Sequence, residues 1–399
     1  MSAYDAFLLL SFGGPEGPGD VLPFLENVTR GRGVPRQRLA EVAEHYHARG
    51  GVSPINAQCR DLLTAIADEF AAGGIDLPLY WGNRNWHPFI EDTVRQMEAD
   101  GVQRAIAFVT SAYGSYSACR QYLDDIDRAI AALDTGARQD RATPRIDKIR
   151  PYFNHPGFIE PFAASAEAAL AGLPAAAQPG ARLVFTAHSV PAGMAACSGS
   201  VSAGTAVQGS VGGRYAAELR EASRLVAERV RGGALPFDLV FQSRSGPPSV
   251  PWLEPDVNDH LAALARGISA TGEPLREGPP SGVVVVPVGF VSDHMEVVHD
   301  LDLEAAATAA SLGLPMARAK APGSTPRFAE MVRELVAERV SGAQPQALGD
   351  LGPRVYQAST EETGTAQAGT AQAGYVAEGA HGCPADCCRY TPSRPARPS

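Results

Sequence analysis

A file of acidic residues is the feature of this sequence best suited to chemistry. Glu296, Asp300 and Glu304 are spaced four residues apart, so a helix would place all three on one face. Like charges in line repel each other, and a solvated helical surface is one interpretation of such a run. The other is a path for a divalent cation, because carboxylate oxygens in file suit a hydrated ion that moves stepwise. His294 and His299 flank the file, either as ligands or as ordinary surface histidines.

His188 is the second candidate, because it follows an apolar run at 181–187. Such a run predicts a buried strand, and ligands of parallel sheets bind beyond the carboxyl ends of the strands. An imidazole has a pKa near neutrality and can accept a proton at working pH. A lone histidine in this place can equally be structural, and its position does not decide between the two.

Basic residues are concentrated between 27 and 49, in a chain that is otherwise acidic. The stretch contains Arg30, Arg32, Arg36, Arg38, His45, Tyr46, His47 and Arg49. It is either a solvated surface or a rim that receives anionic groups such as carboxylates. Gly13 and Gly14 lack the third glycine of a dinucleotide loop and the lysine of a P-loop, so we reject nucleotide binding there.

Three cysteines lie within six residues near the end of the chain: Cys383, Cys387 and Cys388. They come after a repeat of Gly-Thr-Ala-Gln-Ala over 364–374, which predicts a flexible linker. A disulfide-bonded tail is one interpretation, but it disagrees with the cytosolic setting that we expect. Zinc or an iron–sulfur cluster are the others, and either needs a fourth ligand from elsewhere in the chain.

The elements that must position these residues alternate between strand and helix. Apolar runs that predict strands lie at 6–11, 77–81, 104–110, 181–187, 237–241 and 282–287. Helical patterns lie between them, which predicts an α/β protein with parallel sheets covered on both faces. The pattern occurs twice. We therefore expect an N-terminal domain over 1–155, a C-terminal domain over 156–345, and a linker with a cysteine-bearing tail over 346–399.

Composition argues against several classes of protein. The chain has 399 residues and a formal net charge of −10, which disfavours a general nucleic-acid binder. Its longest apolar run, 283–291, is about half of what a membrane-spanning helix needs. An early acid and the lack of a basic region before Leu8 argue against a secretory signal. We expect a cytoplasmic chain without membrane insertion.

Several motifs together resemble the ferrochelatase family over nearly the whole chain up to about residue 340. The matching segments, in the family's order, are SFGGP (11–15), RGR (30–32), GGVSP (50–54), PFIED (88–92), TAHSVP (186–191), QSRSG (242–246), PWLEP (251–255) and the run 289–304. Chance agreement at so many points is improbable.

The resemblance implies two Rossmann-like domains with a porphyrin in the cleft between them. It implies that His188 and Glu296 receive pyrrole protons and handle Fe²⁺, the metal substrate, and that Asp300 and Glu304 form the outer metal path. A cleft that bends the macrocycle exposes nitrogen lone pairs and lowers the barrier. Some bacterial members carry a tyrosine where this chain has Phe12, which cannot ligate iron and is expected to pack on the ring.

The resemblance also bears on which porphyrin is used. Members acting on protoporphyrin often have an apolar lip that meets a membrane, whereas the matching segment here is rich in arginine and histidine. The four carboxylates of coproporphyrin need more such partners. Tyr46, Ser53 and Tyr122 match positions that hold propionates in coproporphyrin-using members, and Arg30 is a further expected contact. We expect coproporphyrin III, with protoporphyrin IX as the alternative.

Some ferrochelatases carry a 2Fe-2S cluster held by one internal and three C-terminal cysteines. Residues 116–119 resemble the internal site, which makes Cys119 the expected partner of the three tail cysteines. Cys59 and Cys197 are competitors for that place, although a buried free cysteine is the ordinary state for each.

Two other functions compete with this interpretation. A cobalt- or nickel-inserting chelatase of the same fold group would use similar ligands, so only the resemblance favours iron and porphyrin. A non-catalytic porphyrin-binding protein is the rival from another class, and the presence of His188 and Glu296 argues against it. As partners we expect the porphyrin and a downstream enzyme of heme synthesis, with no nucleic acid and a monomeric chain.

Overall fold

Two parallel β-sheets of four strands each organise the chain in this computed structural model, which describes residues 4–31, 33–133, 143–199, 212–246, 249–353 and 387–390. The first sheet has the order β2-β1-β3-β4 and the second β6-β5-β7-β8. The strands are β1 (Ala6–Ser11), β2 (Leu79–Asn83), β3 (Arg104–Val109), β4 (Arg145–Lys148), β5 (Ala181–His188), β6 (Phe237–Gln242), β7 (Gly282–Val286) and β8 (Met316–Arg318). The predicted α/β class with parallel sheets is confirmed.

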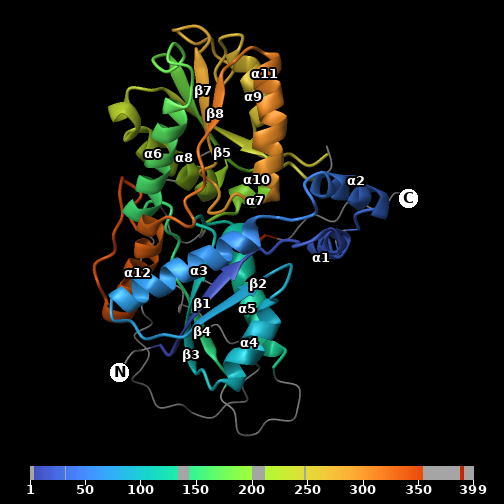
Figure 1. Cartoon of the computed structure of the whole chain (residues 1–399), viewed down its shortest axis with the longest axis vertical. Coiled ribbons are helices and arrows are strands. Elements are labelled where there is room, and N and C mark those ends of the chain that lie inside the picture. The colour runs from blue at the N-terminus through green and yellow to red at the C-terminus, as the bar shows by residue number, and fades with distance from the viewer. Residues whose placement is uncertain are drawn as a thin grey trace.

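Helices cover both faces of each sheet, and Figure 1 shows the two sheets arranged along the long axis with α1 and α2 projecting beside their junction. The helices are α1 (Val21–Val28), α2 (Arg36–His47), α3 (Ile55–Ala72), α4 (Ile90–Ala99), α5 (Gln121–Ala131), α6 (Pro156–Ala171), α7 (Ala192–Ala196), α8 (Gly213–Ala227), α9 (Val257–Leu264), α10 (Met295–His299), α11 (Ala306–Ser311) and α12 (Pro326–Ser341). Two short π-helices, Tyr116–Arg120 and Asp300–Ala305, precede α5 and α11.

Alternate residues of the strands enter different cores, as expected for a sheet that is buried on both faces. In β1, Leu8 and Leu10 pack with α4 and α5, whereas Phe7 and Leu9 enter a larger core. That larger core also contains residues of β5, α6, α8 and α12, so both sheets contribute to it. The two halves of the chain therefore share buried apolar surface.

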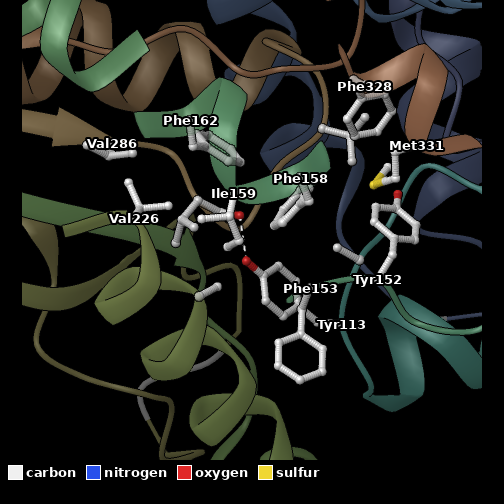
Figure 2. Packing of buried hydrophobic residues seen from close by; sticks show 14 of the residues in the cluster. Tyr113, Tyr152, Phe153, Phe158, Ile159, Phe162, Val226, Val286, Phe328 and Met331 are labelled. Atoms are coloured by element: carbon white, nitrogen blue, oxygen red, sulfur yellow. Dashed lines mark hydrogen bonds between the residues drawn. The ribbon is translucent and has the colours of Figure 1, made fainter. Parts of the chain in front are cut away.

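Aromatic side chains fill the middle of this shared core (Figure 2). The Tyr113 and Phe158 rings meet edge to face, with centroids 6.0 Å apart. The Tyr113 hydroxyl donates to the Val288 carbonyl at 2.8 Å, which ties the loop after β3 to the loop after β7. The final helix, α12, packs against both α3 and α6. The expected boundary at residue 155 stays a prediction.

The order of the strands creates a switch point in each sheet. β5 lies between β6 and β7, so the connections from its carboxyl end and from that of β7 diverge. Ligands of open α/β sheets bind at such a crevice. His188 is the last residue of β5, and the loop after β7 leads to α10. Among the described residues, no helix has the length and apolar character needed to cross a bilayer.

Candidate active site

His188 and Glu296 face each other at the switch point of the second sheet. His188 ends β5, and Glu296 lies in the first turn of α10, which comes after the neighbouring strand β7. The Nε2 atom of His188 is 3.7 Å from Oε2 of Glu296. The side chains are 34% and 49% exposed, so both are open to a ligand from outside. The two residues that the sequence singled out are thus brought together.

Backbone contacts set the tautomer of His188. Its Nδ1 lies 2.5 Å from the carbonyl oxygen of Ser189. A carbonyl only accepts hydrogen bonds, so Nδ1 donates to it, and in the neutral tautomer the bare nitrogen is Nε2, which faces Glu296. The Ser189 amide donates to the Gln242 carbonyl and its hydroxyl to Leu253, both at 2.8 Å. The base therefore sits on an anchored turn.

Asp300 lies deeper, where the helix after Glu296 changes its hydrogen-bond pattern. The Ser243 hydroxyl donates to its Oδ2, and Nε2 of Gln242 donates to the same oxygen at 3.2 Å. Burial raises the pKa of Asp300 to about 6, and the charges of Glu296 and Glu304 act in the same direction against the Ser243 hydrogen bond. The carboxyl thus exchanges its proton near neutral pH, which suits a transient cation site.

Two imidazole rings, those of His299 and His45, lie at the outer end of the acidic file. Ligand atoms of His299, Asp300 and Glu304 all lie within 4.8 Å of one another, and Nε2 of His299 is 3.4 Å from Oε1 of Glu304. The His299 ring stacks on His45 of α2 at 4.1 Å between centroids. The sequence predicted a regular helix here. The π-helix Asp300–Ala305 replaces it, and such insertions are frequent at functional sites because they re-aim side chains.

A pocket joins this file to the projecting helices α1 and α2. Its lining is Phe12, Phe24, Leu25, Val28, Val42, His45, Tyr46, Met295, Glu296, His299 and Asp300. Most of the lining is apolar or aromatic, and Glu296 and Asp300 add two carboxylates. An aromatic macrocycle with a polar centre would match such a lining.

Comparison with known proteins agrees with this geometry. The family model for ferrochelatases matches residues 4–340. The chain belongs to the ferrochelatase family. Members of this family insert a metal ion into a porphyrin, so the protein is an enzyme, a lyase of the metal-chelatase type.

Several curated relatives cover most of the chain. The coproporphyrin III ferrochelatase of Nocardia farcinica is 54% identical over 87% of this chain and 91% of its own. That of Streptomyces griseus is 51% identical over 88% of this chain and 90% of its own. A ferrochelatase of Rhodopirellula baltica is 46% identical over 98% of this chain and 95% of its own, so that match extends into the tail.

The expected substrate contacts of this ferrochelatase fall into two groups. Phe12 and Tyr46 line the pocket, and burial together with Glu296 and Asp300 raises the pKa of the Tyr46 phenol. Ser53 is 4% exposed and lies outside the lining. Arg30 and Tyr122 also lie outside the pocket lining. Arg30 is exposed just after α1, and Tyr122 is buried where α5 packs against the first sheet. The guanidinium of Arg84 covers the Tyr122 ring.

Two of the expected cluster cysteines lie in the short described part of the tail, and Cys383 lies outside the described residues. Cys387 and Cys388 are buried, with their sulfurs 3.7 Å apart. Cys119 is buried in the π-helix Tyr116–Arg120.

Packing brings the tail next to the Cys119 segment. The ring of Tyr390 lies 6.4 Å from that of Tyr116, which belongs to the same π-helix as Cys119. The competing cysteines differ: burial raises the pKa of Cys59 to about 11, and Cys197 is exposed.

Sequence reasoning did not single out Gln242 and Ser243, which hold Asp300. A signal was present, because both belong to the QSRSG segment at the end of β6, and Gln242 pairs with His188 in the sheet register. His45 and Phe24 also enter the pocket, although nothing in their spacing indicates which way they face.

Proposed function

We propose that this enzyme inserts Fe²⁺ into coproporphyrin III to give Fe-coproporphyrin in heme biosynthesis, with His188 and Glu296 at the centre of the reaction. The observation that carries the chemistry is the bare Nε2 of His188 opposite the Glu296 carboxylate at 3.7 Å. Several relatives about half identical to the chain are named coproporphyrin III ferrochelatases, which supports the substrate.

Proton transfer is the task of this pair. Two N–H protons leave the porphyrin for each Fe²⁺ that enters, so the site must accept both and return them to solvent. Nε2 of His188 accepts a proton from the ring, and Glu296 relays it, because half of its side chain is exposed.

Iron reaches the ring along the acidic file. His299 and Glu304 form its outer end, Asp300 its buried middle and Glu296 its inner end. Carboxylate and imidazole ligands suit Fe²⁺ and exchange readily. Each transfer along the helix is short, because Asp300 lies next to ligand atoms of the outer group.

The choice between the two porphyrins depends on the basic residues of the stretch 27–49, which we call the rim. The exposed Arg30 and the arginines of α2 offer charged partners for carboxylates, and coproporphyrin carries more of them than protoporphyrin. Ser53 and Tyr122 remain part of the proposed propionate contacts and would need the rim to rearrange around the substrate, since neither is exposed.

An anaerobic insertion assay with both porphyrins tests the function. We expect faster turnover of coproporphyrin III than of protoporphyrin IX with Fe²⁺. Faster turnover of protoporphyrin IX would contradict the substrate and leave the reaction intact. Lack of turnover with either would contradict the enzymatic function.

A 2Fe-2S cluster held by Cys119, Cys383, Cys387 and Cys388 is the second part of the proposal. Two sulfurs bound to one tetrahedral metal at about 2.3 Å stand about 3.8 Å apart. The 3.7 Å between Cys387 and Cys388 therefore fits two thiolates on one iron without rearrangement. Such a cluster would supply a one-electron redox centre. Iron and acid-labile sulfide analysis of protein purified without oxygen tests it, and a colourless protein lacking both would contradict it.

We further propose a cytoplasmic, monomeric enzyme that divides near residue 155 and passes its product to a downstream heme-pathway enzyme. The acidic net charge and the short apolar runs of the sequence support this setting. Size-exclusion chromatography with light scattering tests the monomer.

A further inference from the structure

The backbone of His188 is held from behind by a tyrosine of α8. The Tyr215 hydroxyl donates a hydrogen bond to the His188 carbonyl oxygen at 3.1 Å. Tyr215 is 5% exposed, and burial raises its pKa, so the phenol keeps its proton and stays a donor. Its ring also meets Tyr113 edge to face at 6.2 Å. This contact fixes the end of β5 from outside the pocket lining.

Ser198 in turn fixes the start of α8. Its hydroxyl oxygen accepts from the Tyr215 amide at 2.8 Å and donates to Ala195 at the end of α7. The fit is tight, because a Cβ on Gly213 would lie 2.1 Å from the Ala195 carbonyl oxygen. The position of Tyr215 therefore depends on where Ser198 is held.

The described part of the cysteine-bearing tail forms hydrogen bonds with Gly199, the residue after Ser198. The Gly199 amide donates to Sγ of Cys388, and the Cys388 amide donates to the Gly199 carbonyl, each at 3.3 Å. Cys388 is 1% exposed and has a positive φ of 56°, a backbone conformation that costs energy and persists only where its surroundings hold it.

The first turns of α8 also contact the segment that carries Cys119. Glu218 is fully buried, and its carboxylate accepts from the Gly114 amide and from Arg214, both at 2.7 Å. Gly114 directly precedes the turn that begins the π-helix Tyr116–Arg120. The start of α8 is thus the place where both cysteine-bearing segments and the catalytic strand meet.

We propose that the tail positions the catalytic histidine through the relay Cys388–Gly199–Ser198–Tyr215–His188, in which Tyr215 is a positioning residue. The inference rests on the proposed role of His188. When the tail is seated, Tyr215 holds the His188 backbone and Nε2 faces Glu296. When the tail is displaced, Ser198 loses its anchor and the ring loses its alignment. Turnover then changes while porphyrin binding does not, because Tyr215, Ser198, Gly199 and Cys388 all lie outside the pocket lining.

Tyr215→Phe removes only the hydroxyl, and Tyr152→Phe is its matched control. Tyr152 is equally buried, and its hydroxyl also donates to a backbone carbonyl, that of Val109 at 2.9 Å. We expect Tyr215→Phe to lower kcat by about tenfold with an unchanged KM for porphyrin, since small misplacements of a catalytic group are costly. Tyr152→Phe is expected to keep kcat, although both variants lose similar thermal stability.

An equal kcat in the two tyrosine variants would overturn the positioning role. A Tyr215→Phe variant that loses porphyrin affinity in proportion to its turnover would also overturn the positioning role. Fluorescence quenching measures that affinity. An inactive parent enzyme would instead contradict the proposed function, so the two failures are distinguishable.

The link to the tail is tested at Cys388. Cys388→Ala removes the acceptor for the Gly199 amide, whereas Cys388→Ser keeps one, and neither retains a thiolate for a metal. Because both variants lose the thiolate equally, their difference reports the hydrogen bond: we expect kcat of Cys388→Ala to be about threefold lower than that of Cys388→Ser, by the size of one hydrogen bond. Added to Tyr215→Phe, Cys388→Ala is expected to change kcat little further. Equal losses in the two cysteine variants, or additive losses in the double variant, would overturn the relay.

Discussion

In the reaction we propose, His188 and Glu296 divide the proton transfer between an anchored base and a solvent-facing acid. The Ser189 carbonyl holds the proton of His188 on Nδ1, which leaves Nε2 to act. Glu296 is half exposed and so remains in contact with solvent. An anchored acceptor beside an exposed carboxylate gives direction to the protons that leave the porphyrin.

Removal of the base should therefore abolish turnover and spare the fold. We expect His188→Ala to lower kcat by about 10²-fold or more, the usual contribution of a positioned general base. His87→Ala is the control, because His87 is exposed and lies outside the pocket lining. Anaerobic initial rates with thermal melts check the result, and a His188→Ala enzyme with parental kcat would contradict the assigned role.

At the scale of the elements, the acidic residues of the π-helix Asp300–Ala305 make two different kinds of contact. Asp300 faces Ser243 and the metal path, whereas Asp302 faces the surface and pairs with Arg318 at 2.5 Å. Asp300 and Asp302 lie two positions apart on one helix, but only Asp300 belongs to the candidate site, whereas Asp302 forms an ion pair outside it. The wider turn brings Glu304 back to the same group as Asp300.

Asp300→Asn should weaken iron uptake alone. We expect the KM for Fe²⁺ to rise about tenfold, because an amide is a poorer ligand than a carboxylate for a hard cation. The KM for porphyrin is expected to stay the same, and Asp302→Asn serves as the control from the same helix. A rise of equal size in both variants would point to damage to the helix rather than to loss of a ligand.

A buried charge cluster holds the starts of β5 and β6 together. Burial opposes the charge of Asp238, but hydrogen bonds from His260 and Arg182 outweigh it and lower its pKa to about 2. Because the folded pKa is below the unfolded value, this stabilisation is present above pH 4 and is lost as the pH falls toward 2.

Asp238→Asn should therefore destabilise the protein most at neutral pH. We expect a loss of about 3 kcal/mol in the free energy of unfolding at pH 7, because the buried Arg182 loses its counter-charge. The difference from the parent should shrink between pH 4 and pH 2. Urea unfolding at several pH values checks this, with the exposed Asp61→Asn as control. A constant difference across that range would contradict the assignment.

At the scale of the whole molecule, one core serves both halves. Phe158 and Phe328 are fully buried in it, together with residues of β1 and β5. Arg150, between the two sheets in sequence, pairs with Glu338 of α12 at 2.7 Å with both side chains nearly buried. The two halves are therefore not independent units.

Phe158→Ala should destabilise both halves at once. We expect a loss of about 4 kcal/mol, the usual cost of truncating a buried aromatic side chain. Because the core is shared, calorimetry should show one transition that moves as a whole, while Leu22→Ala at the exposed surface leaves it in place. Two separate transitions, with only one displaced, would contradict a shared core.

The sequence alone determined most of the strands and the residues at their carboxyl ends. Apolar runs are local signals, and parallel strands share one functional edge, so His188 and the loop to Glu296 were placed correctly at the carboxyl ends of strands. The edge strands β4 and β8 were missed, because one is charged and both are too short for an apolar run. The edge strands β2 and β6 were found, because each contains an apolar run.

Only the tertiary structure decided which side chains meet. The turn of α2 that aims Tyr46 at the carboxylates, the π-helix that regroups Asp300 with His299, and the contact of Cys388 with Gly199 all depend on how elements pack rather than on local spacing. The direction in which a helical side chain faces is set by that packing, and spacing along the chain does not record it. His188 itself was visible in the sequence, but Tyr215 behind it was not, because their contact forms only when α8 docks on the end of β5.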